Sequence, residues 1–528
     1  MRHIPGAVPA VGAGLRAFPQ THGRTGARTH GWVRTAFLWA CCVCAFVRPV
    51  FGQCPDGTPP PCGANRTGHA RPATNSLAVL YFDNVSRDSN DVYLADGLTE
   101  ELISRLGDVT RLEVKSRYVS QRFRGRPVAD PAALGREAGA AYLVTGSVRR
   151  AGNRVRVTAE LVRASTGDRV WGATLDRESA DVLSIEEQIA QEVALGVAGT
   201  LLPAERATLS HRPTQDAAAY DLYLQGLHSV AVVTEQGQRR AVDLFSQAVA
   251  RDPQFALAWA ELAQAWSDLA DSWVAPREAY AKAVDAANRA IAIDSGLAEG
   301  WVQLGQPVAA MTYDLARSER VTRRALALDP RNADALAWLG LVRLAEGQED
   351  EALADLRRAF LLDSLSMVTG FSVTGALAVL ERGDDLEAML PRLVYALGPD
   401  DLRQAEGTVR LEKGDCAGAA ERLDWRYVGG WPPGQAVQSL VCAGRRDAAR
   451  AVVDSMAAAT RGPGYFNPVS VAAGYAVLGD TTDAYRWLER AYDEHTYWFT
   501  FLPVFRGFAA LRADAHFAAL ERRIKVVD

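Results

Sequence analysis

Four of the seven cysteines are spaced so that they could form disulfide bonds. Cys54 and Cys62 enclose the Pro- and Gly-rich segment CPDGTPPPC, where we expect a short disulfide loop if the chain is exported. Zinc binding is the alternative, but two Cys without a nearby His or a second Cys pair make a poor zinc site. Cys416 and Cys442 lie about one helical repeat apart, so they form either a disulfide or two buried thiols.

The other residue types that commonly carry catalysis are not arranged as a known active site. The eight His are dispersed, and none belongs to an HExxH motif or a pair at helical ligand spacing. The sequence also lacks a GxSxG, a P-loop, a GxGxxG that follows a strand, and a kinase signature. We therefore expect no catalytic residues, no cofactor, no metal and no enzymatic activity.

Two further groups of side chains could bind a ligand, but each also has a purely structural interpretation. Asp88, Asp91 and Asp96 form an acidic stretch, but they lack the alternating register and central Gly of a calcium loop. We interpret them as a solvated loop leading into a helix that Asp96 or Thr99 caps. Five Trp could form a carbohydrate platform, although their places in the repeats favour core packing, least clearly for Trp273. They are Trp259, Trp266, Trp273, Trp301 and Trp338.

The second half of the chain, residues 215–528, is rich in Ala, Leu and Arg with helical periodicity. An Asp followed by Pro or Ser recurs at Asp252, Asp294, Asp329 and Asp363, with spacings of 42, 35 and 34 residues. The last spacing is the tetratricopeptide (TPR) period, and the first implies an insertion around 271–277. The pattern predicts seven to eight helix pairs stacked as an all-α superhelix.

A TPR superhelix presents the first helix of each pair along a concave surface, and this surface is the expected binding site. Repeat offsets place five polar residues there: Gln264, Asp268, Glu299, Gln306 and Asp334. Such a groove would bind a protein or peptide, and its acidity would favour a basic or amide-rich ligand.

Residues 76–205 read as a small α/β domain. A continuous apolar run at 77–82 indicates a buried strand, and Leu98, Leu102 and Leu106 have helical spacing. A strand pair at 142–149 and 154–162 is joined by a turn at 151–153, and a closing helix starts at 184 with a Ser184–Glu187 capping box.

These segments carry a family resemblance. LAVLYFDNVS, YLADGLTEELISRL, YLVTGSVRRAGNRVRVTAELV and STGDRVWGATLDRE resemble the TolB-like or FlgO-like N-terminal domain, which in many bacterial proteins precedes TPR repeats. Tyr81 departs from the family pattern, which usually has Pro there. The family has no established catalytic residues, so the resemblance implies a fold and no chemistry.

The N-terminal 52 residues resemble an export signal. The apolar run 36–47 is too short to span a bilayer and suits a signal-peptide core, with a cleavage site after Gly52. Its leader is unusually long, and a start at Val33 would make a compact signal peptide. An uncleaved inner-membrane anchor through 35–52 is the alternative. Residues 53–75 read as a flexible linker.

The net charge of the chain indicates which class of partner is disfavoured. The whole chain carries −5, and removing the six Arg of residues 1–52 leaves −11. An acidic body disfavours nucleic acid as a partner. The sequence thus predicts a periplasmic or cell-envelope TPR protein that mediates protein–protein interaction or scaffolding. The alternative is a sensory component, in which the α/β domain binds a small ligand and the repeats relay its state.

Overall fold

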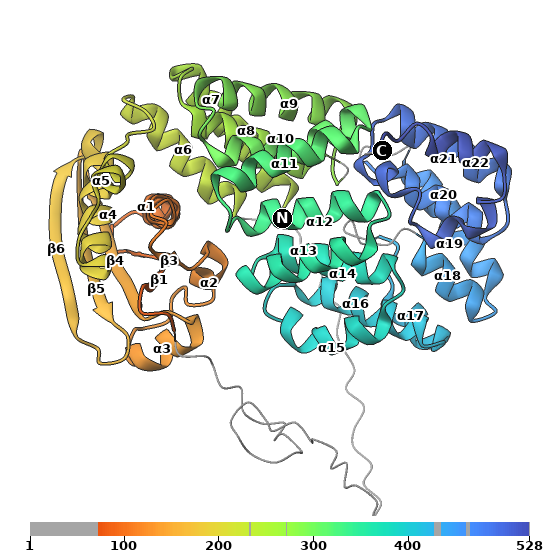
Figure 1. Cartoon of the computed structure of the whole chain (residues 1–528), viewed down its shortest axis with the longest axis horizontal. Coiled ribbons are helices and arrows are strands. Elements are labelled where there is room, and N and C mark those ends of the chain that lie inside the picture. Colours follow the sequence, from red (N-terminus) through yellow and green to blue (C-terminus); the bar gives the residue numbers. More distant parts are fainter. Residues whose placement is uncertain (1–71, 232–233, 271, 427–433, 461–464, 527–528) are drawn as a thin grey trace, which may run out of the picture. The chain divides into compact units, whose positions relative to one another are not determined.

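The structure is a computed structural model that describes residues 72–231, 234–270, 272–426, 434–460 and 465–526 (Figure 1). The predicted signal peptide at 1–52, the linker up to residue 71, and Cys54 and Cys62 lie outside these residues. So does residue 271 of the insertion.

A six-stranded mixed sheet forms the first folded region, with the strand order β3-β1-β4-β5-β6 and with β2 paired to β4. β1 runs parallel to β3 and β4, whereas β4, β5 and β6 are antiparallel neighbours. Gly152, at φ +60°, reverses the chain between β4 and β5, as the predicted turn requires. The strands are β1 (Ser76–Val79), β2 (Asp83–Asn84), β3 (Glu113–Val114), β4 (Tyr142–Ala151), β5 (Arg154–Arg163) and β6 (Arg169–Glu178).

Helices cover both faces of this sheet. Leu98 and Leu102 of α1 and Ile189 of α4 share a core with the apolar side of β4 and β5. Leu134 of α3 packs with Leu143 on the opposite face. The helices of this region are α1 (Val92–Gly107), α2 (Arg117–Gln121), α3 (Pro131–Ala138), α4 (Val182–Ala198) and α5 (Pro203–Leu209).

Two predicted helix starts are wrong. Helix α1 begins at Val92, so Asp96 and Thr99 lie inside it and are buried. Asp96 is not in a solvated loop, because its carboxylate binds the side chains of Arg124 and His228. Helix α4 begins at Val182, and Ser184 donates a hydrogen bond to the Asp181 carbonyl (2.7 Å) instead of forming a capping box.

Residues 217–493 form eight helix pairs in the described part of the chain. The pairs are α6 (Ala217–Val230) with α7 (Glu235–Arg251), α8 (Ala256–Leu269) with α9 (Pro276–Ile293), α10 (Ala298–Thr312) with α11 (Leu315–Leu328), α12 (Ala333–Ala345) with α13 (Glu349–Leu362), α14 (Met367–Val379) with α15 (Gly383–Leu393), α16 (Pro399–Glu412) with α17 (Cys416–Arg422), α18 (Gln435–Cys442) with α19 (Arg446–Ala459), and α20 (Pro468–Val477) with α21 (Thr481–Asp493); α22 (Ala515–Glu521) follows. The fold class is as predicted: a small mixed-sheet α/β domain followed by an all-α TPR superhelix.

The recurring Asp of the sequence ends the second helix of four pairs. Each Asp carboxylate accepts a hydrogen bond from the backbone N–H two residues further on, at 2.8–3.2 Å. Such an Asx turn satisfies the backbone where the helix stops. The four residues are Asp252, Asp294, Asp329 and Asp363.

The Trp residues are less buried than core packing predicts. Trp259, Trp266 and Trp301 are only partly buried at the edge of the core. The indole N–H of Trp259 donates to the Pro253 carbonyl (3.1 Å), and the Arg289 guanidinium lies 4.7 Å from its ring centre. The indole N–H of Trp301 donates likewise to the Ser295 carbonyl (3.1 Å), so both of these indoles keep their polar side at the edge of the core.

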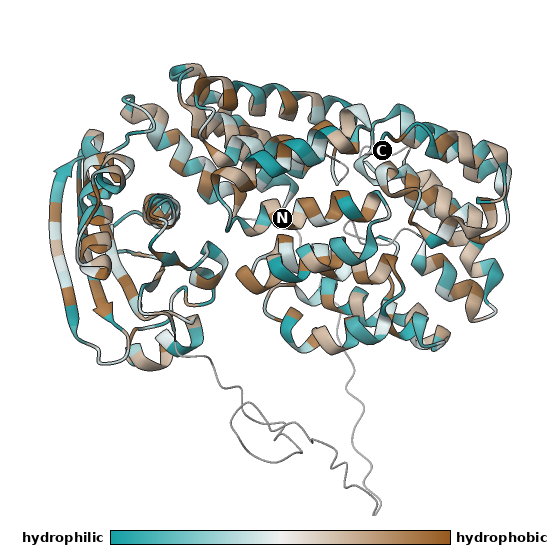
Figure 2. Cartoon of the chain, in the orientation of Figure 1, coloured by the Kyte–Doolittle hydropathy of each residue, from teal (hydrophilic) through white to brown (hydrophobic). Residues whose placement is uncertain are grey.

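The α/β domain and the first repeats share one core. Leu98 of α1 and Leu224 of α6 belong to the same buried cluster, and residues 69–528 form one compact unit. A side chain at Gly97 would meet the Leu224 Cβ at 2.8 Å, so glycine allows this close helix approach. Hydrophobic and hydrophilic residues alternate along the repeat helices (Figure 2). In the described residues, no helix combines the length and hydropathy that a membrane span requires.

Candidate functional site

Five carboxylates from successive repeats lie near enough to influence one another's pKa through their charges. Glu261 and Asp268 come from α8, Glu299 from α10, Asp334 from α12, and Asp363 from the end of α13. The first four are half-buried, and Asp363 is buried. We call these five residues the acidic groove, after the concave binding surface that the repeat pattern predicts.

Burial makes these carboxylates unusually weak acids. Removal from water raises the pKa of Glu261 and of Asp268 to about 7 and that of Asp334 to about 6. The pKa values of Glu299 and Asp363 also rise, mainly through burial. The charge of Arg117 in α2 lowers the pKa of Asp334 without offsetting burial. A bound cation would therefore stabilise the ionised groove.

The five predicted groove residues fall on these helices. Asp268, Glu299 and Asp334 belong to the acidic groove. Gln264 on α8 accepts a hydrogen bond from Gln303 on α10 (3.4 Å), so it bridges two repeats.

Gln306 is half-buried and donates a hydrogen bond to the Tyr280 hydroxyl (3.2 Å). Repeat offsets missed Glu261 and Asp363. Glu261 could have been found, because it lies one helical turn before Gln264 on α8. The sequence marked Asp363 only as one of the recurring Asp that end a repeat, and nothing in it indicated a binding role.

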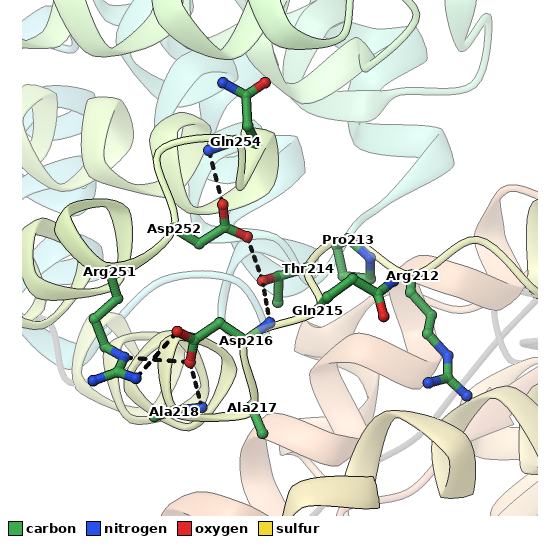
Figure 3. Close-up of a pocket in the computed structure, with 10 residues that line it drawn as sticks. All are labelled: Arg212, Pro213, Thr214, Gln215, Asp216, Ala217, Ala218, Arg251, Asp252 and Gln254. Atoms are coloured by element: carbon green, nitrogen blue, oxygen red, sulfur yellow. Dashed lines mark hydrogen bonds and ion pairs between the residues drawn. The ribbon is translucent and has the colours of Figure 1, made fainter.

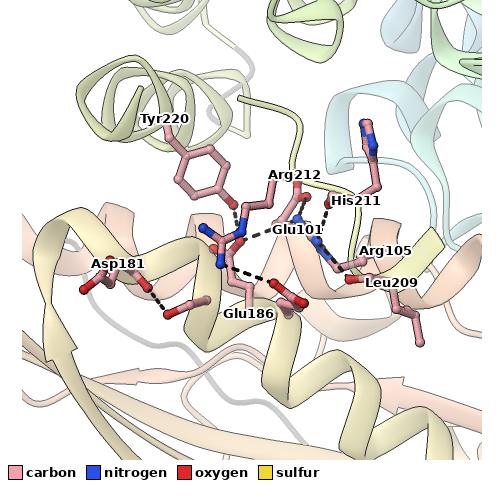
Figure 4. Close-up of polar contacts among 10 residues, drawn as sticks. Glu101, Arg105, Asp181, Glu186, Leu209, His211, Arg212 and Tyr220 are labelled. Atoms are coloured by element: carbon pink, nitrogen blue, oxygen red, sulfur yellow. Dashed lines mark hydrogen bonds and ion pairs between the residues drawn. The ribbon is translucent and has the colours of Figure 1, made fainter. Parts of the chain in front are cut away.

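A second polar cluster lies where the α/β domain joins the repeats (Figure 4). Glu101 and Arg105 of α1, Glu186 of α4 and Tyr220 of α6 are all buried, and Glu186 is 0% exposed. Arg105 contacts Glu101 at 3.1 Å and Glu186 at 4.0 Å, and the Tyr220 hydroxyl donates to Glu186. We call these four residues the junction cluster.

The junction cluster holds two carboxyl groups and one guanidinium. Burial, followed by the charge of Glu101, raises the pKa of Glu186 to about 8. Arg105 also donates to the Leu209 and His211 carbonyls, at 3.2 and 2.8 Å. The cluster therefore ties α1 to α4 and to the segment that leads into the repeats.

A recess beside this segment is lined by charged side chains that already have partners (Figure 3). Asp216 caps the start of α6 and pairs with Arg251 at 3.1 Å. Asp252 binds the Thr214 hydroxyl and the Gln254 N–H. These contacts fasten the interdomain segment to the first repeat, so we assign the recess a structural role.

The two C-terminal-half cysteines are joined in the structure. Cys416 begins α17, Cys442 ends α18, and a disulfide links them with a Cα–Cα distance of 5.5 Å. That distance is typical of disulfides. In the described residues, no three His, Cys, Asp or Glu side chains gather as a metal site.

No protein-family model matches the chain. A putative adenylate cyclase 3 of Rhizobium meliloti (strain 1021) is 32% identical over 191 residues, which are 36% of this chain and 32% of that protein. The chain thus spans about a third of that relative's length.

Two solved TPR structures are similar to part of the chain. A thermophilic TPR protein of Thermus thermophilus is 21% identical, covering 37% of this chain and 100% of its own, with a TM-score of 0.32. YrrB, a TPR protein with an unusual peptide-binding site, is 19% identical, covering 39% and 97%, with a TM-score of 0.26.

Proposed function

We propose that the chain is a non-enzymatic TPR protein that binds a basic segment of a partner protein in the acidic groove. The observation that supports this proposal is that half-buried carboxylates from α8, α10 and α12 lie near enough to raise one another's pKa. Partly desolvated carboxylates attract a cation more strongly than exposed ones do, because water screens them less. Main-chain contacts and side-chain anchors along the repeats would supply the rest of the affinity.

Replacing Asp268 and Asp334 together with Asn should weaken binding of a short fluorescent peptide with two Arg about tenfold or more, since each charge-assisted hydrogen bond is worth roughly 1.5–3 kcal/mol. Fluorescence anisotropy with the mature chain measures this affinity. Affinity should also rise as pH increases from 5.5 to 8, because Asp334 and Asp268 lose their protons near pH 6 and 7.

The matched control for this test is Asp285→Asn. Asp285 lies on α9, is exposed and pairs with Arg289 at 3.0 Å, so its loss should leave peptide affinity unchanged. A peptide with citrulline in place of Arg should not bind. Equal affinity of the wild type and the Asp268/Asp334 variant would exclude the groove as the binding site.

We also propose that the protein is exported to the periplasm or cell envelope, as a scaffold with a TolB-like or FlgO-like domain. The support is the sequence of residues 1–52 and the cysteine usage. N-terminal sequencing of the protein from fractionated cells should give Gln53 as the first residue in the soluble periplasmic fraction. An intact N-terminus in the membrane fraction would indicate an anchored protein instead.

The proposed absence of enzymatic activity needs a separate assay, because one relative is named a putative adenylate cyclase. Since the chain spans about a third of that protein, we do not extend a cyclase activity to it. Incubation of the purified chain with ATP and Mg²⁺ should yield no cyclic AMP above a heat-treated sample.

The second candidate function is a sensory component. The junction cluster favours it, because Glu186 and Tyr220 link the α/β domain directly to the first repeat helix. A small ligand that shifts α1 or α4 would move α6 through these contacts. Metabolite binding by the mature chain, with altered peptide affinity as a consequence, would favour this function over a passive scaffold.

A further inference from the structure

We propose that the concave surface of α10, α12 and α14 is a binding site for an aromatic peptide segment, and that the chain's own residues 495–506 occupy it. These three helices are the first helices of successive pairs, which line the concave side of a TPR superhelix. The segment follows α21 and includes the 3-10 helix η3 (Tyr497–Phe501). This inference goes beyond the function proposed above, and it does not depend on the acidic groove.

The end of α10 holds the first part of the segment. The ring of Tyr313, directly after α10, stacks on His495 with 5.7 Å between the ring centres and 6° between the planes. Phe499 packs against the same ring at 5.2 Å, and the Tyr313 hydroxyl donates a hydrogen bond to the Tyr492 carbonyl (3.1 Å). Tyr313 has a φ of +50°, which a large side chain rarely adopts. Such a conformation persists where surrounding contacts fix it, and the segment supplies such contacts.

The next two repeats hold the rest of the segment. The rings of Trp338 on α12 and Tyr497 meet edge to face, with 6.3 Å between their centres. Arg506 pairs with Glu381, just after α14, at 2.9 Å. Tyr497 is 6% exposed and Phe499 is 0% exposed, and both belong to the core that the repeat helices form. The segment is therefore seated in the apolar surface of the repeats and is not laid over it.

The composition of the segment indicates which chemistry this surface accepts. Five of the nine residues at 497–505 (YWFTFLPVF) are aromatic and none is charged, whereas aromatic residues make up 8% of the whole chain. Aromatic rings bury a large apolar area and are common anchors in binding sites. The ligand class is therefore an uncharged, aromatic-rich segment, which differs from the basic segment proposed for the acidic groove.

The chain holds the segment at both ends. Helix α21 leads into it, and the C-terminal end of the chain returns to the same repeats. The Lys525 N–H donates to the Tyr313 carbonyl (2.7 Å), and the Lys525 carbonyl accepts from the Leu315 N–H (2.8 Å). A tethered segment has a high effective concentration at its site, so it excludes a free peptide of the same sequence. This surface is thus closed to other chains in the wild type.

Phe499→Ala tests whether the surface is a binding site. The substitution removes the buried ring that packs against Tyr313, which weakens the tethered segment and opens the surface to a free copy. We expect the variant to bind a fluorescein-labelled peptide of residues 494–506 at least about tenfold more tightly than the wild type does, because the tethered competitor is weaker. Fluorescence anisotropy with the mature chain measures both affinities, and circular dichroism checks that the variant is folded.

Phe517→Ala is the matched control. Phe517 in α22 is also 0% exposed, and it packs on Phe508 of η4 (Arg506–Leu511) at 6.0 Å. Its loss leaves a similar cavity but should not change the affinity for the peptide. His495→Asn is a milder second variant, because His495 is only half-buried and Asn tolerates its φ of +56°. It removes the stacking on Tyr313, so it should raise the affinity by a smaller factor.

The three variants together decide the inference. A gain in Phe499→Ala and His495→Asn, with none in Phe517→Ala, is the expected result. Wild-type affinity in both of the first two variants would overturn the binding site. An equal gain in Phe517→Ala would overturn it too, because any loosening of the C-terminal core would then expose surface that binds the peptide. If Phe499→Ala does not fold, His495→Asn decides alone against the same control.

Discussion

Arg105→Met should lower the free energy of unfolding by about 3–5 kcal/mol at pH 8, because it leaves buried carboxylates without their cation. Arg105 is 5% exposed and lies within 4.0 Å of both Glu101 and Glu186. Methionine keeps much of the side-chain volume, so the loss reports charge and hydrogen bonding more than a cavity. Urea unfolding followed by circular dichroism measures the change.

The stability lost in Arg105→Met should increase as the pH rises. The pKa of Glu186 is raised to about 8 in the folded protein, against an ordinary value of 4.5. Between these values the folded state holds a proton that the unfolded state has released, so stability falls as pH rises through the window. Without Arg105, whose charge lowers the pKa of Glu186, the Glu186 carboxyl keeps its proton to still higher pH. The free energy of unfolding of the variant should therefore be close to that of the wild type at pH 5 and clearly lower at pH 8.

A second substitution provides the internal control. Glu186→Gln added to Arg105→Met should recover part of the lost stability at pH 8, since one uncompensated charge is removed while the amide oxygen still accepts from Tyr220. Arg154→Met, at an exposed ion pair with Asp176, should leave stability nearly unchanged. If Arg105→Met were as stable as Arg154→Met, the junction cluster would not hold the two regions together.

The elements that the sequence predicts well are those set by neighbouring residues. Asp252 and Asp329 mark helix ends because each caps backbone only two residues away. The alternation from Arg154 to Leu161 predicts β5 because one side of a strand faces the core and the other faces water. Repeat offsets likewise predict that Asp268 and Asp334 lie on the first helices of their pairs, and both do, on α8 and α12; their place in a binding groove stays a prediction.

The features that the sequence does not predict correctly depend on contacts with residues far along the chain. Asp96 looks like a helix cap, but His228 lies 132 residues later and Arg124 28 residues later, and both bind its carboxylate. The sequence gives no reason for a glycine at position 97, which the structure explains by the close approach of Leu224. Nothing near Arg331 in the sequence shows that its side chain donates to the Leu112 carbonyl, 219 residues earlier in the chain. Tertiary packing determines these contacts, and a single sequence does not reveal such pairs.

The disulfide between Cys416 and Cys442 connects the fold to the proposed compartment. It joins α17 to α18, the facing helices of two consecutive pairs, across a sequence separation of 26 residues. The two helices are short, at 7 and 8 residues, so they bury little apolar surface of their own. A covalent link there adds stability to two short helices, and such bonds form and persist mainly in oxidising compartments.

Reduction of this bond should destabilise the C-terminal repeats by about 3.5 kcal/mol, the chain entropy that a loop of this length regains in the unfolded state. Chemical unfolding of the oxidised and dithiothreitol-treated protein measures the difference. A Cys416→Ser/Cys442→Ser variant should be as unstable as the reduced wild type and indifferent to reductant, which separates this bond from any that Cys54 forms with Cys62. If reductant destabilised this variant as much as the wild type, the Cys416–Cys442 bond would not be the source of the effect. Free thiols at both positions in protein from the periplasm would contradict the bond itself.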